Sequence, residues 1–255
     1  MSGLLAGRRL LATGVLTEAS LASAVVRLAV AEGADVLLTS PVCRGHRVTT
    51  RVAPRLGVTR AVVELDVTLP EDLAALEAGV RAAGWDGVDG VLHAIAYLPS
   101  PPGPFSAAPW SAVAEVVQTA AWSLAAVVHA VRPLLAPGAA VVGLTMDPSR
   151  THEGQDWLGV ARGALATTAR YLAHDLGDLG VRVNLVATGP QRTLLSRSLP
   201  GRERLEASWA QRAPLGWDPA DRTAVARAAV ALLSDWFPAT TGEVVHVDGG
   251  AHTAG

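Results

Sequence analysis

The stretch from Arg9 to Leu28 has residue types that could hold a pyrophosphate. A short apolar run stops at Gly14 and apolar residues then recur at helical spacing, which predicts a buried strand, a turn and a helix. The N–H groups that open such a helix are unpaired and carry partial positive charge, and small residues such as Ser20 let a phosphate approach the backbone. Because Gly14 alone remains of a G-x-G-x-x-G pattern, the stretch predicts either a nucleotide site or a purely structural turn.

Acid–base chemistry is restricted by the absence of lysine. All 21 basic side chains are arginine and the only tyrosines are Tyr97 and Tyr171, so a lysine Schiff base or a Tyr–Lys pair is excluded. Tyr171 lies in a helical pattern, which favours a role in packing. His93 is a lone histidine in an apolar run, which favours a structural role over chemistry.

The elements that must position these residues indicate an α/β protein. The chain has 255 residues, 50% of them hydrophobic, and apolar strand-like runs alternate with helical patterns from end to end. We expect one domain, residues 1–255, built as a single Rossmann-type doubly wound parallel sheet with helices on both faces. Further strands are predicted at residues 34–39, 61–67, 88–96 and 139–145, and a long helix at residues 110–135.

The carboxyl ends of these strands are where such a sheet binds its ligand. Ala94, Ile95 and Ala96 should border the ligand. Asp66 could contact an adenine amino group, and could also cap the helix that starts near Pro70.

Arginine follows the second predicted strand, which ends at Ser40 and Pro41. Arg44, Arg47 and Arg51 could accept an extra ribose phosphate, but their spacing favours a solvated helix face.

Several classes of protein are excluded by composition. Cys43 is the only cysteine, so neither a disulfide framework nor a cysteine-rich metal site can form within the chain, and we expect no metal. The net charge of −2 gives no reason to expect nucleic-acid binding. No signal sequence or membrane-length apolar run is evident, so we expect a cytoplasmic protein that does not bind membranes.

The chain also resembles a known family over essentially its whole length. The matching motifs lie in residues 14–22, 64–67, 93–99, 147–150, 157–161, 181–186, 189–193, 211–214, 232–236, 239–242 and 248–253. Among them are Asp147-Pro-Ser-Arg150, Gly189-Pro-x-Arg-Thr193 and Asp248-Gly-Gly-Ala-His-Thr253. They resemble the NADH-dependent enoyl-acyl-carrier-protein reductases of the short-chain dehydrogenase/reductase superfamily, most of all the mycobacterial type that reduces long fatty acyl chains.

The resemblance implies an NADH site and a homotetramer. It places the pyrophosphate at Gly14, Ser20, Leu21 and Thr193, the adenine at Asp66 and Val67, the ribose region at Ala94 to Ala96, and the nicotinamide at Met146, Arg162 and Gly189 to Gln191. NADPH stays an alternative, because Pro41 occupies a position where the family usually has an aromatic residue against the adenine.

The positions that carry catalysis in the family differ here. Where the resemblance implies a tyrosine and, seven residues later, a lysine, the chain has Gln155 and Arg162. A glutamine can donate a hydrogen bond but cannot supply a proton, and a guanidinium is larger than an ammonium group. Tyr97 ends the fourth strand and could be a replacement acid or an aromatic wall of the substrate site.

Three interpretations of function follow. The first is reduction of a conjugated carbonyl or enoyl substrate, small or carrier-bound, by NADH. The second is a repurposed biosynthetic enzyme that catalyses cyclisation, elimination or isomerisation without net redox change, and the third is a nucleotide-binding pseudoenzyme. The segment at residues 194–208 is short and rich in charge for the roof of a fatty-acyl tunnel, which favours a substrate smaller or more polar than a long fatty acyl chain.

Overall fold

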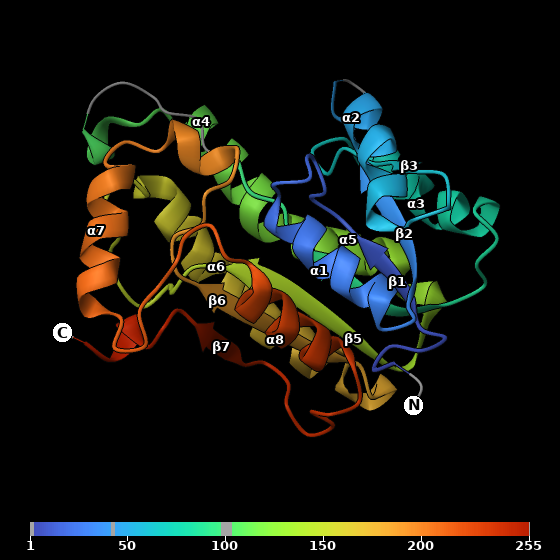
Figure 1. Cartoon of the computed structure of the whole chain (residues 1–255). Helices are drawn as coiled ribbons and strands as arrows, with labels where there is room; N and C mark the ends of the chain where they lie inside the picture. The colour runs from blue at the N-terminus through green and yellow to red at the C-terminus, as the bar shows by residue number, and fades with distance from the viewer. Residues whose placement is uncertain (1–2, 42–43, 98–103, 255) are drawn as a thin grey trace.

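Seven parallel strands form one sheet in the order β3-β2-β1-β4-β5-β6-β7 (Figure 1). The computed structural model describes residues 3–41, 44–97 and 104–254. The strands are β1 Arg9–Ala12, β2 Asp35–Ser40, β3 Val63–Glu64, β4 Val88–His93, β5 Leu135–Thr145, β6 Arg182–Thr188 and β7 Val244–Val247. The order reverses between β1 and β4, which opens a crevice at their carboxyl ends and confirms the predicted doubly wound fold.

Helices cover both faces of this sheet (Figure 1). The α-helices are α1 Leu21–Ala31, α2 Arg44–Val52, α3 Pro70–Ala82, α4 Trp110–Val117, α5 Ser123–Val131, α6 Asp156–Asp175, α7 Arg202–Arg212 and α8 Thr223–Leu233. A π-helical turn, Gln118–Trp122, joins α4 to α5, and short 3₁₀ turns lie at Ala53–Leu56, Phe105–Ala107, Arg132–Leu134, Gly177–Leu179, Leu195–Ser198 and Ala251–Thr253. Buried residues of α1 and α8 share one core cluster, whereas those of α3, α5 and α6 share another.

The central strands separate these two cores. In β1, Leu10 and Ala12 belong to the core beneath α1 and α8, and Leu11 belongs to the core beneath α3, α5 and α6. Successive residues of a strand point to opposite faces, so a sheet covered on both sides needs a continuous apolar run. This requirement explains why the predicted strand has no polar alternation.

Three elements differ from their predicted limits. The third strand is reduced to Val63–Glu64, because it pairs with β2 alone at the sheet edge and then turns at Asp66. The long predicted helix is broken by the π-helical turn. β5 starts at Leu135, ahead of the proline and glycine expected to precede it, and its pairing with β4 shifts register between Val88 and Gly90.

One helical stretch bears on the prediction that no apolar run reaches membrane length. The helical stretch Trp110–Leu134 is long and apolar enough to cross a membrane by length and composition. In the fold, however, 56% of its most apolar window is buried, and its residues pack against α3 and α6. These contacts are those of a core helix in a globular domain.

Two further predictions concern exposure. Tyr171 was expected to pack inside the protein but is 74% exposed on α6, because the apolar side chains around it, not its own, face the sheet. Arg47 and Arg51 are exposed on α2, as a solvated helix face requires. The side chain of Arg44, and Cys43, lie outside the described residues.

Candidate active site

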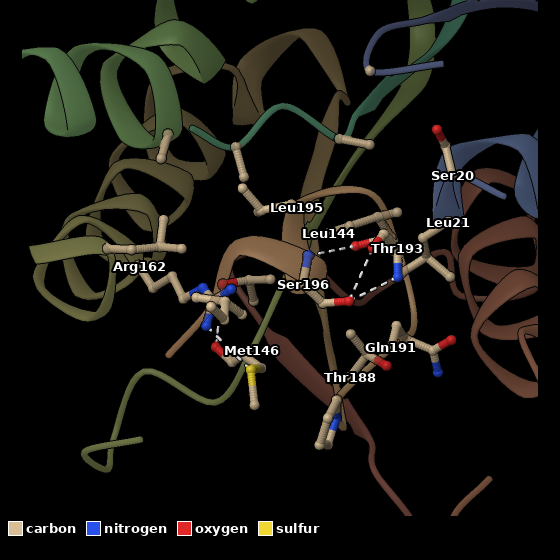
Figure 2. A pocket seen from close by; sticks show the side chains of 18 of the residues that line it. Ser20, Leu21, Leu144, Met146, Arg162, Thr188, Gln191, Thr193, Leu195 and Ser196 are labelled. Carbon is tan, nitrogen blue, oxygen red and sulfur yellow. Dashed lines mark hydrogen bonds between the residues drawn. The ribbon is translucent and has the colours of Figure 1, made fainter. Parts of the chain in front are cut away.

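Two adjoining cavities open at the carboxyl ends of the strands, with volumes of about 190 and 320 Å³. Both are bordered by Gly14 and by Ala94 to Ala96. The first also has Ser20, Leu21, Met146, Gln155, Arg162, Gly189, Gln191 and Thr193 on its wall, and the second has Asp66, Val67 and Tyr97. The fold therefore gathers every predicted site residue around one crevice. Figure 2 shows one of the cavities, with Arg162 and Met146 apart from Ser20 and Leu21.

The turn between β1 and α1 brings backbone against the crevice. Gly14 has a φ of +78°, and a Cβ there would lie 2.0 Å from the carbonyl oxygen of Ala94. Only glycine tolerates both conditions. The Thr13 hydroxyl donates to the Leu92 carbonyl at 3.1 Å and accepts from the Ala94 N–H at 3.2 Å, which fastens this turn to β4. Sequence reasoning missed Thr13.

The start of α1 presents free donors to the same crevice. Ser20 is the N-cap residue, and its hydroxyl accepts a hydrogen bond from the Thr17 N–H at 3.0 Å. Because the hydroxyl oxygen is the acceptor in this bond, its hydrogen can still be donated to a ligand. The first N–H groups of the helix have no partner within it, so they suit an anion such as phosphate.

The second cavity contains a carboxylate with a free oxygen. Asp66 Oδ1 accepts from the Thr68 N–H at 2.9 Å and from its hydroxyl at 2.6 Å, whereas Oδ2 accepts no hydrogen bond from the described residues. Asp66 is not the helix cap, because Leu69 occupies the N-cap position of α3. The predicted capping role is therefore wrong, and Asp66 lines a cavity together with Glu115 and Thr119.

Gln155 is the N-cap residue of α6 and is buried, with 1% of its surface exposed. Both polar atoms of its side chain, Nε2 and Oε1, lack a hydrogen-bond partner among the described residues. The next residue, Asp156, has a φ of +38°, in the left-handed region that costs non-glycine residues energy. A buried amide with two unmet hydrogen-bonding atoms is expensive unless a ligand satisfies it.

Arg162 lies on the same helix, seven residues or about two turns further along, and borders the same cavity. Its Nη1 donates to the Met146 Sδ at 3.1 Å, and no carboxylate of the described residues lies within ion-pair distance. Burial lowers the pKa of Arg162 to about 10. An arginine that stays charged in such surroundings provides strong positive potential for a ligand.

The loop after β6 forms the opposite wall. A Cβ at Gly189 would lie 2.6 Å from the ring of Trp217, whose Nε1 donates to the Pro190 carbonyl at 2.8 Å. Gln191 donates from Nε2 to the Asp221 carbonyl at 3.3 Å, which leaves its Oε1 buried and without a partner among the described residues. This loop is therefore held rigidly and presents one unused acceptor.

His93 is fully buried, and its Nε2 lies 2.8 Å from the Ser123 hydroxyl. Burial lowers the pKa of His93 to about 4, so the ring is neutral at pH 7. Its surroundings support the structural role that the sequence favours. Tyr97 is 42% exposed, and it borders the cavity of Asp66 but not that of Gln155.

The comparisons with known proteins agree with this geometry. The family model described as Enoyl-(Acyl carrier protein) reductase matches residues 14–252. This chain belongs to the enoyl-(acyl-carrier-protein) reductase family. An enoyl-[acyl-carrier-protein] reductase [NADH] of Mycolicibacterium smegmatis is 40% identical over 268 residues, covering 99% of both chains. The protein of that name from Mycobacterium avium is 39% identical, with the same coverage. A relative from Aquifex aeolicus is 33% identical over 99% of this chain and 94% of its own.

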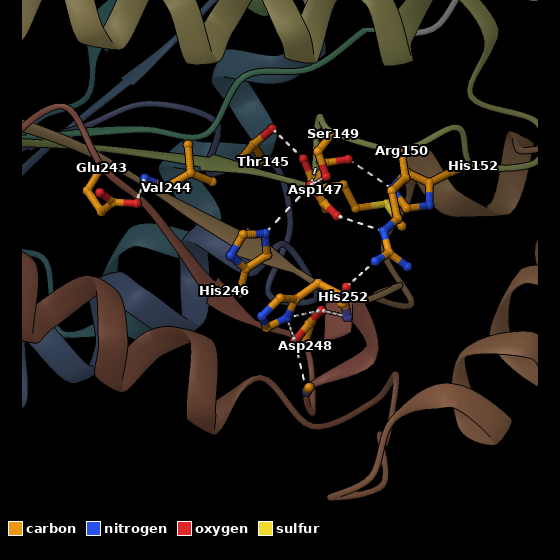
Figure 3. A network of polar contacts seen from close by, with 12 residues as sticks. Thr145, Asp147, Ser149, Arg150, His152, Glu243, Val244, His246, Asp248 and His252 are labelled. Carbon is orange, nitrogen blue, oxygen red and sulfur yellow. Dashed lines mark hydrogen bonds and ion pairs between the residues drawn. The ribbon is translucent and has the colours of Figure 1, made fainter. Parts of the chain in front are cut away.

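A polar network beside the site fixes the loop that leads to Gln155 in this member of the reductase family (Figure 3). Burial alone would raise the pKa of Asp147, but hydrogen bonds from Ser149 and the nearby His246 ring, 3.6 Å away, hold it below its usual value. Arg150 donates to the carbonyl oxygens of His252 and Ala254. The loop after β5 is thus tied to the end of the described chain, which stabilises the N-terminus of α6.

The sequence analysis placed the charge-rich segment 194–208 over the substrate but did not single out the two charged residues of the first cavity. Arg202 and Glu206, on α7, line the cavity together with apolar residues of the preceding segment. In the sequence nothing separates them from the other charged residues of this stretch. Only the packing of α7 over the cavity distinguishes them from Arg204, whose side chain is 77% exposed.

Proposed function

We propose that this protein uses NADH to reduce a conjugated carbonyl compound, an enoyl thioester on a carrier, whose acyl part is smaller or more polar than a long fatty acyl chain. The observation that carries the proposal is the buried, unpartnered amide of Gln155, which borders the same cavity as the Gly14 turn and the Gly189 loop. The family supports the reaction class, since the relatives above bear the name of NADH-dependent enoyl reductases.

The residues of the crevice fit a dinucleotide. The N-terminus of α1 suits a pyrophosphate, and Asp66 Oδ2 offers an acceptor to an adenine amino group. The unused Oε1 of Gln191 could accept from a carboxamide N–H. Each of these protein groups has unused hydrogen-bonding capacity, and each matches one part of the dinucleotide.

The charge of the second cavity supports NADH over NADPH. Its described lining has the carboxylates of Asp66 and Glu115 and no cationic side chain, so an added ribose phosphate would meet negative charge. A relative from Staphylococcus aureus, 29% identical, is named as an NADPH enzyme, so the family includes both preferences.

The bound cofactor would supply the hydride. In our proposal Gln155 Nε2 donates a hydrogen bond to the substrate carbonyl oxygen, where negative charge develops as the β-carbon is reduced. Arg162 adds positive potential and hydrogen bonds toward the cofactor ribose. Because an amide supplies no proton, the proton that completes the reduction comes from water. The position of Tyr97, in the cavity of Asp66, supports an aromatic wall more than an acid at the carbonyl.

The same observation favours one other reaction class. An amide donor beside a desolvated guanidinium can stabilise an enolate without any hydride transfer, which is what an isomerisation or elimination in a specialised pathway would require. We propose it as the second candidate.

We also propose a homotetramer, which exposed aromatic side chains support, and a cytoplasmic location, for which the structure gives no separate argument. Trp236 is 69% exposed, next to Phe237 after α8, and Trp110 is 77% exposed. Surfaces of this kind are typical of subunit interfaces. A light-scattering mass near the 26.3 kDa monomer at micromolar concentration would exclude the assembly.

The test is to incubate the protein with crotonyl-pantetheine or hexenoyl-pantetheine, with and without NADH, and to follow absorbance at the NADH band together with product mass. Reduction predicts stoichiometric loss of NADH and a product heavier by two hydrogens. Product of unchanged mass, formed without NADH, would support the second candidate instead. No turnover and no NADH binding would overturn both.

A further inference from the structure

The wall of the first cavity is not uniformly apolar where the acyl part of a substrate would lie. The segment that covers it supplies Leu194, Leu195, Leu199 and Leu205, and α7 adds the charged pair Arg202 and Glu206. The charged residues that line this cavity among the described part of the chain are these two and Arg162.

The negative charge of Glu206 is already engaged outside the cavity lining. Its Oε2 accepts from Arg192 Nε at 3.1 Å and from Arg192 Nη2 at 2.8 Å, with only 12% of the side chain exposed. The hydrogen bonds to Glu206 raise the pKa of Arg192 accordingly. Both of these hydrogen bonds end on Oε2, so Oε1 remains for Arg202, whose Nη1 lies 3.7 Å from it.

Arg202 is ion-paired, but its guanidinium makes no hydrogen bond with the described residues. It forms ion pairs with Glu206 at 3.7 Å and with Glu203 at 3.8 Å, both beyond hydrogen-bond distance, and its side chain is 32% exposed. It makes no side-chain hydrogen bond within the described ranges, so its planar set of donors is unused. A guanidinium with free donors on a partly desolvated wall fits a carboxylate.

The neighbourhood of Arg202 adds a second unused polar group. A Cβ at Gly154 would lie 2.1 Å from the Pro200 carbonyl oxygen, so the segment that leads into α7 is packed against the residue before Gln155. The Gln155 amide, buried and without a partner, borders the same cavity. The substrate carbonyl can satisfy Gln155, but an alkyl chain over Arg202 would desolvate its guanidinium with no compensating hydrogen bond.

We propose that the acyl part of the substrate carries a carboxylate, and that Arg202 binds this group and determines specificity. This inference rests on the proposed acyl substrate. Arg162 remains at the cofactor and carbonyl end, and Arg202 recognises the anionic group of the acyl part. The positive charge of both residues favours an anionic substrate over the neutral fatty acyl chain of the same length.

Equilibrium binding tests the inference without requiring turnover. The probes are glutaryl-pantetheine, which ends in a carboxylate, and hexanoyl-pantetheine, which ends in a methyl group, measured by calorimetry with NADH present and absent. The wild type should bind the glutaryl thioester at least about tenfold more tightly, and Arg202→Gln should abolish this preference. The matched control is Arg204→Gln, two residues away on α7 and paired with Glu153 at the surface, which should keep the preference.

The preference should also weaken as sodium chloride is raised from 0.05 to 0.5 M, because it depends on charge. Melting temperatures of both variants near that of the wild type verify folding. Equal or tighter binding of the hexanoyl thioester, an equal loss in Arg204→Gln, or no binding of either probe below millimolar concentration would overturn the inference. Since no reduction is measured, failure of the proposed reaction and failure of this specificity are distinguished.

Discussion

The Arg162 guanidinium donates to the Met146 thioether at 3.1 Å, a contact between a cation and a weak acceptor. A sulfur cannot neutralise an arginine, and burial lowers the pKa of Arg162 to about 10. The protein therefore carries an uncompensated positive charge in its active site. This charge lowers the stability of the fold but creates a positive electrostatic potential where the ligand binds.

Replacement of that charge should stabilise the unliganded protein. We expect Arg162→Met to raise the free energy of unfolding by about 1–3 kcal/mol, since each unit of pKa shift corresponds to ~1.4 kcal/mol and lost packing offsets part of the gain. NADH binding should weaken in the same variant. Urea denaturation and calorimetry measure the two effects, with the exposed Arg47→Met as control. A loss of stability exceeding that of the control would contradict this account of Arg162.

Acid stability should depend on His93. Because its folded pKa of about 4 lies below the unfolded value of 6.5, the unfolded chain binds the proton first as the pH falls, and the fold loses up to about 3 kcal/mol between pH 6.5 and 4. Above pH 6.5, the pKa of His93 in the unfolded chain, this loss of folding stability is absent. His93→Gln should flatten this part of the stability curve, whereas the exposed His129→Gln should not. Urea denaturation at half-unit pH steps would measure it, and parallel curves for wild type and His93→Gln would refute it.

A substitution that changes a single side-chain atom of Asp66 tests the proposed contact with adenine. Asp66→Asn keeps the Oδ1 acceptor for Thr68 but converts the free Oδ2 into a donor. Loss of a hydrogen bond to an adenine amino group should weaken NADH binding about tenfold, the equivalent of roughly 1.4 kcal/mol. Fluorescence titration with NADH provides the dissociation constant. If Asp66→Asn and wild type bind NADH equally, the adenine lies elsewhere.

The residues that the resemblance implies at positions 155 and 162 can also be restored. The double variant Gln155→Tyr with Arg162→Lys should reduce enoyl-pantetheine thioesters faster than the wild type, because a phenol can supply both a hydrogen bond and a proton. Activity on the native substrate should fall in parallel. A double variant that folds, binds NADH and reduces these thioesters no faster than wild type would show that the rest of the site has diverged as well.

The sheet and most of the crevice follow from local patterns. A continuous apolar run such as Leu10 to Ala12 indicates a strand buried on both faces, and the carboxyl ends of adjacent strands then bring Gly14 and Ala94 together. The π-helical turn between α4 and α5 has no comparable pattern in the sequence.

Side-chain direction could not be predicted in the same way. Tyr171 lies in the same run of apolar helix residues as its buried neighbours on α6. Only the orientation of α6 against the sheet leaves its side chain exposed. Arg202 and Arg204 are equally charged and two residues apart. Their different environments result from how α7 lies over the cavity, which depends on contacts between segments distant in sequence, such as Arg192 with Glu206.

The central claim is that the Gln155 amide stabilises charge on the substrate carbonyl. Single-turnover oxidation of saturating NADH by an enoyl-pantetheine thioester measures this step directly, in wild type, Gln155→Ala and the surface control Gln211→Ala. Loss of one such donor is typically worth a factor of about 10²–10³ in rate, so Gln155→Ala should be slower by that factor while Gln211→Ala equals the wild type. A Gln155→Ala variant that folds, binds NADH and transfers hydride at the wild-type rate would contradict the account.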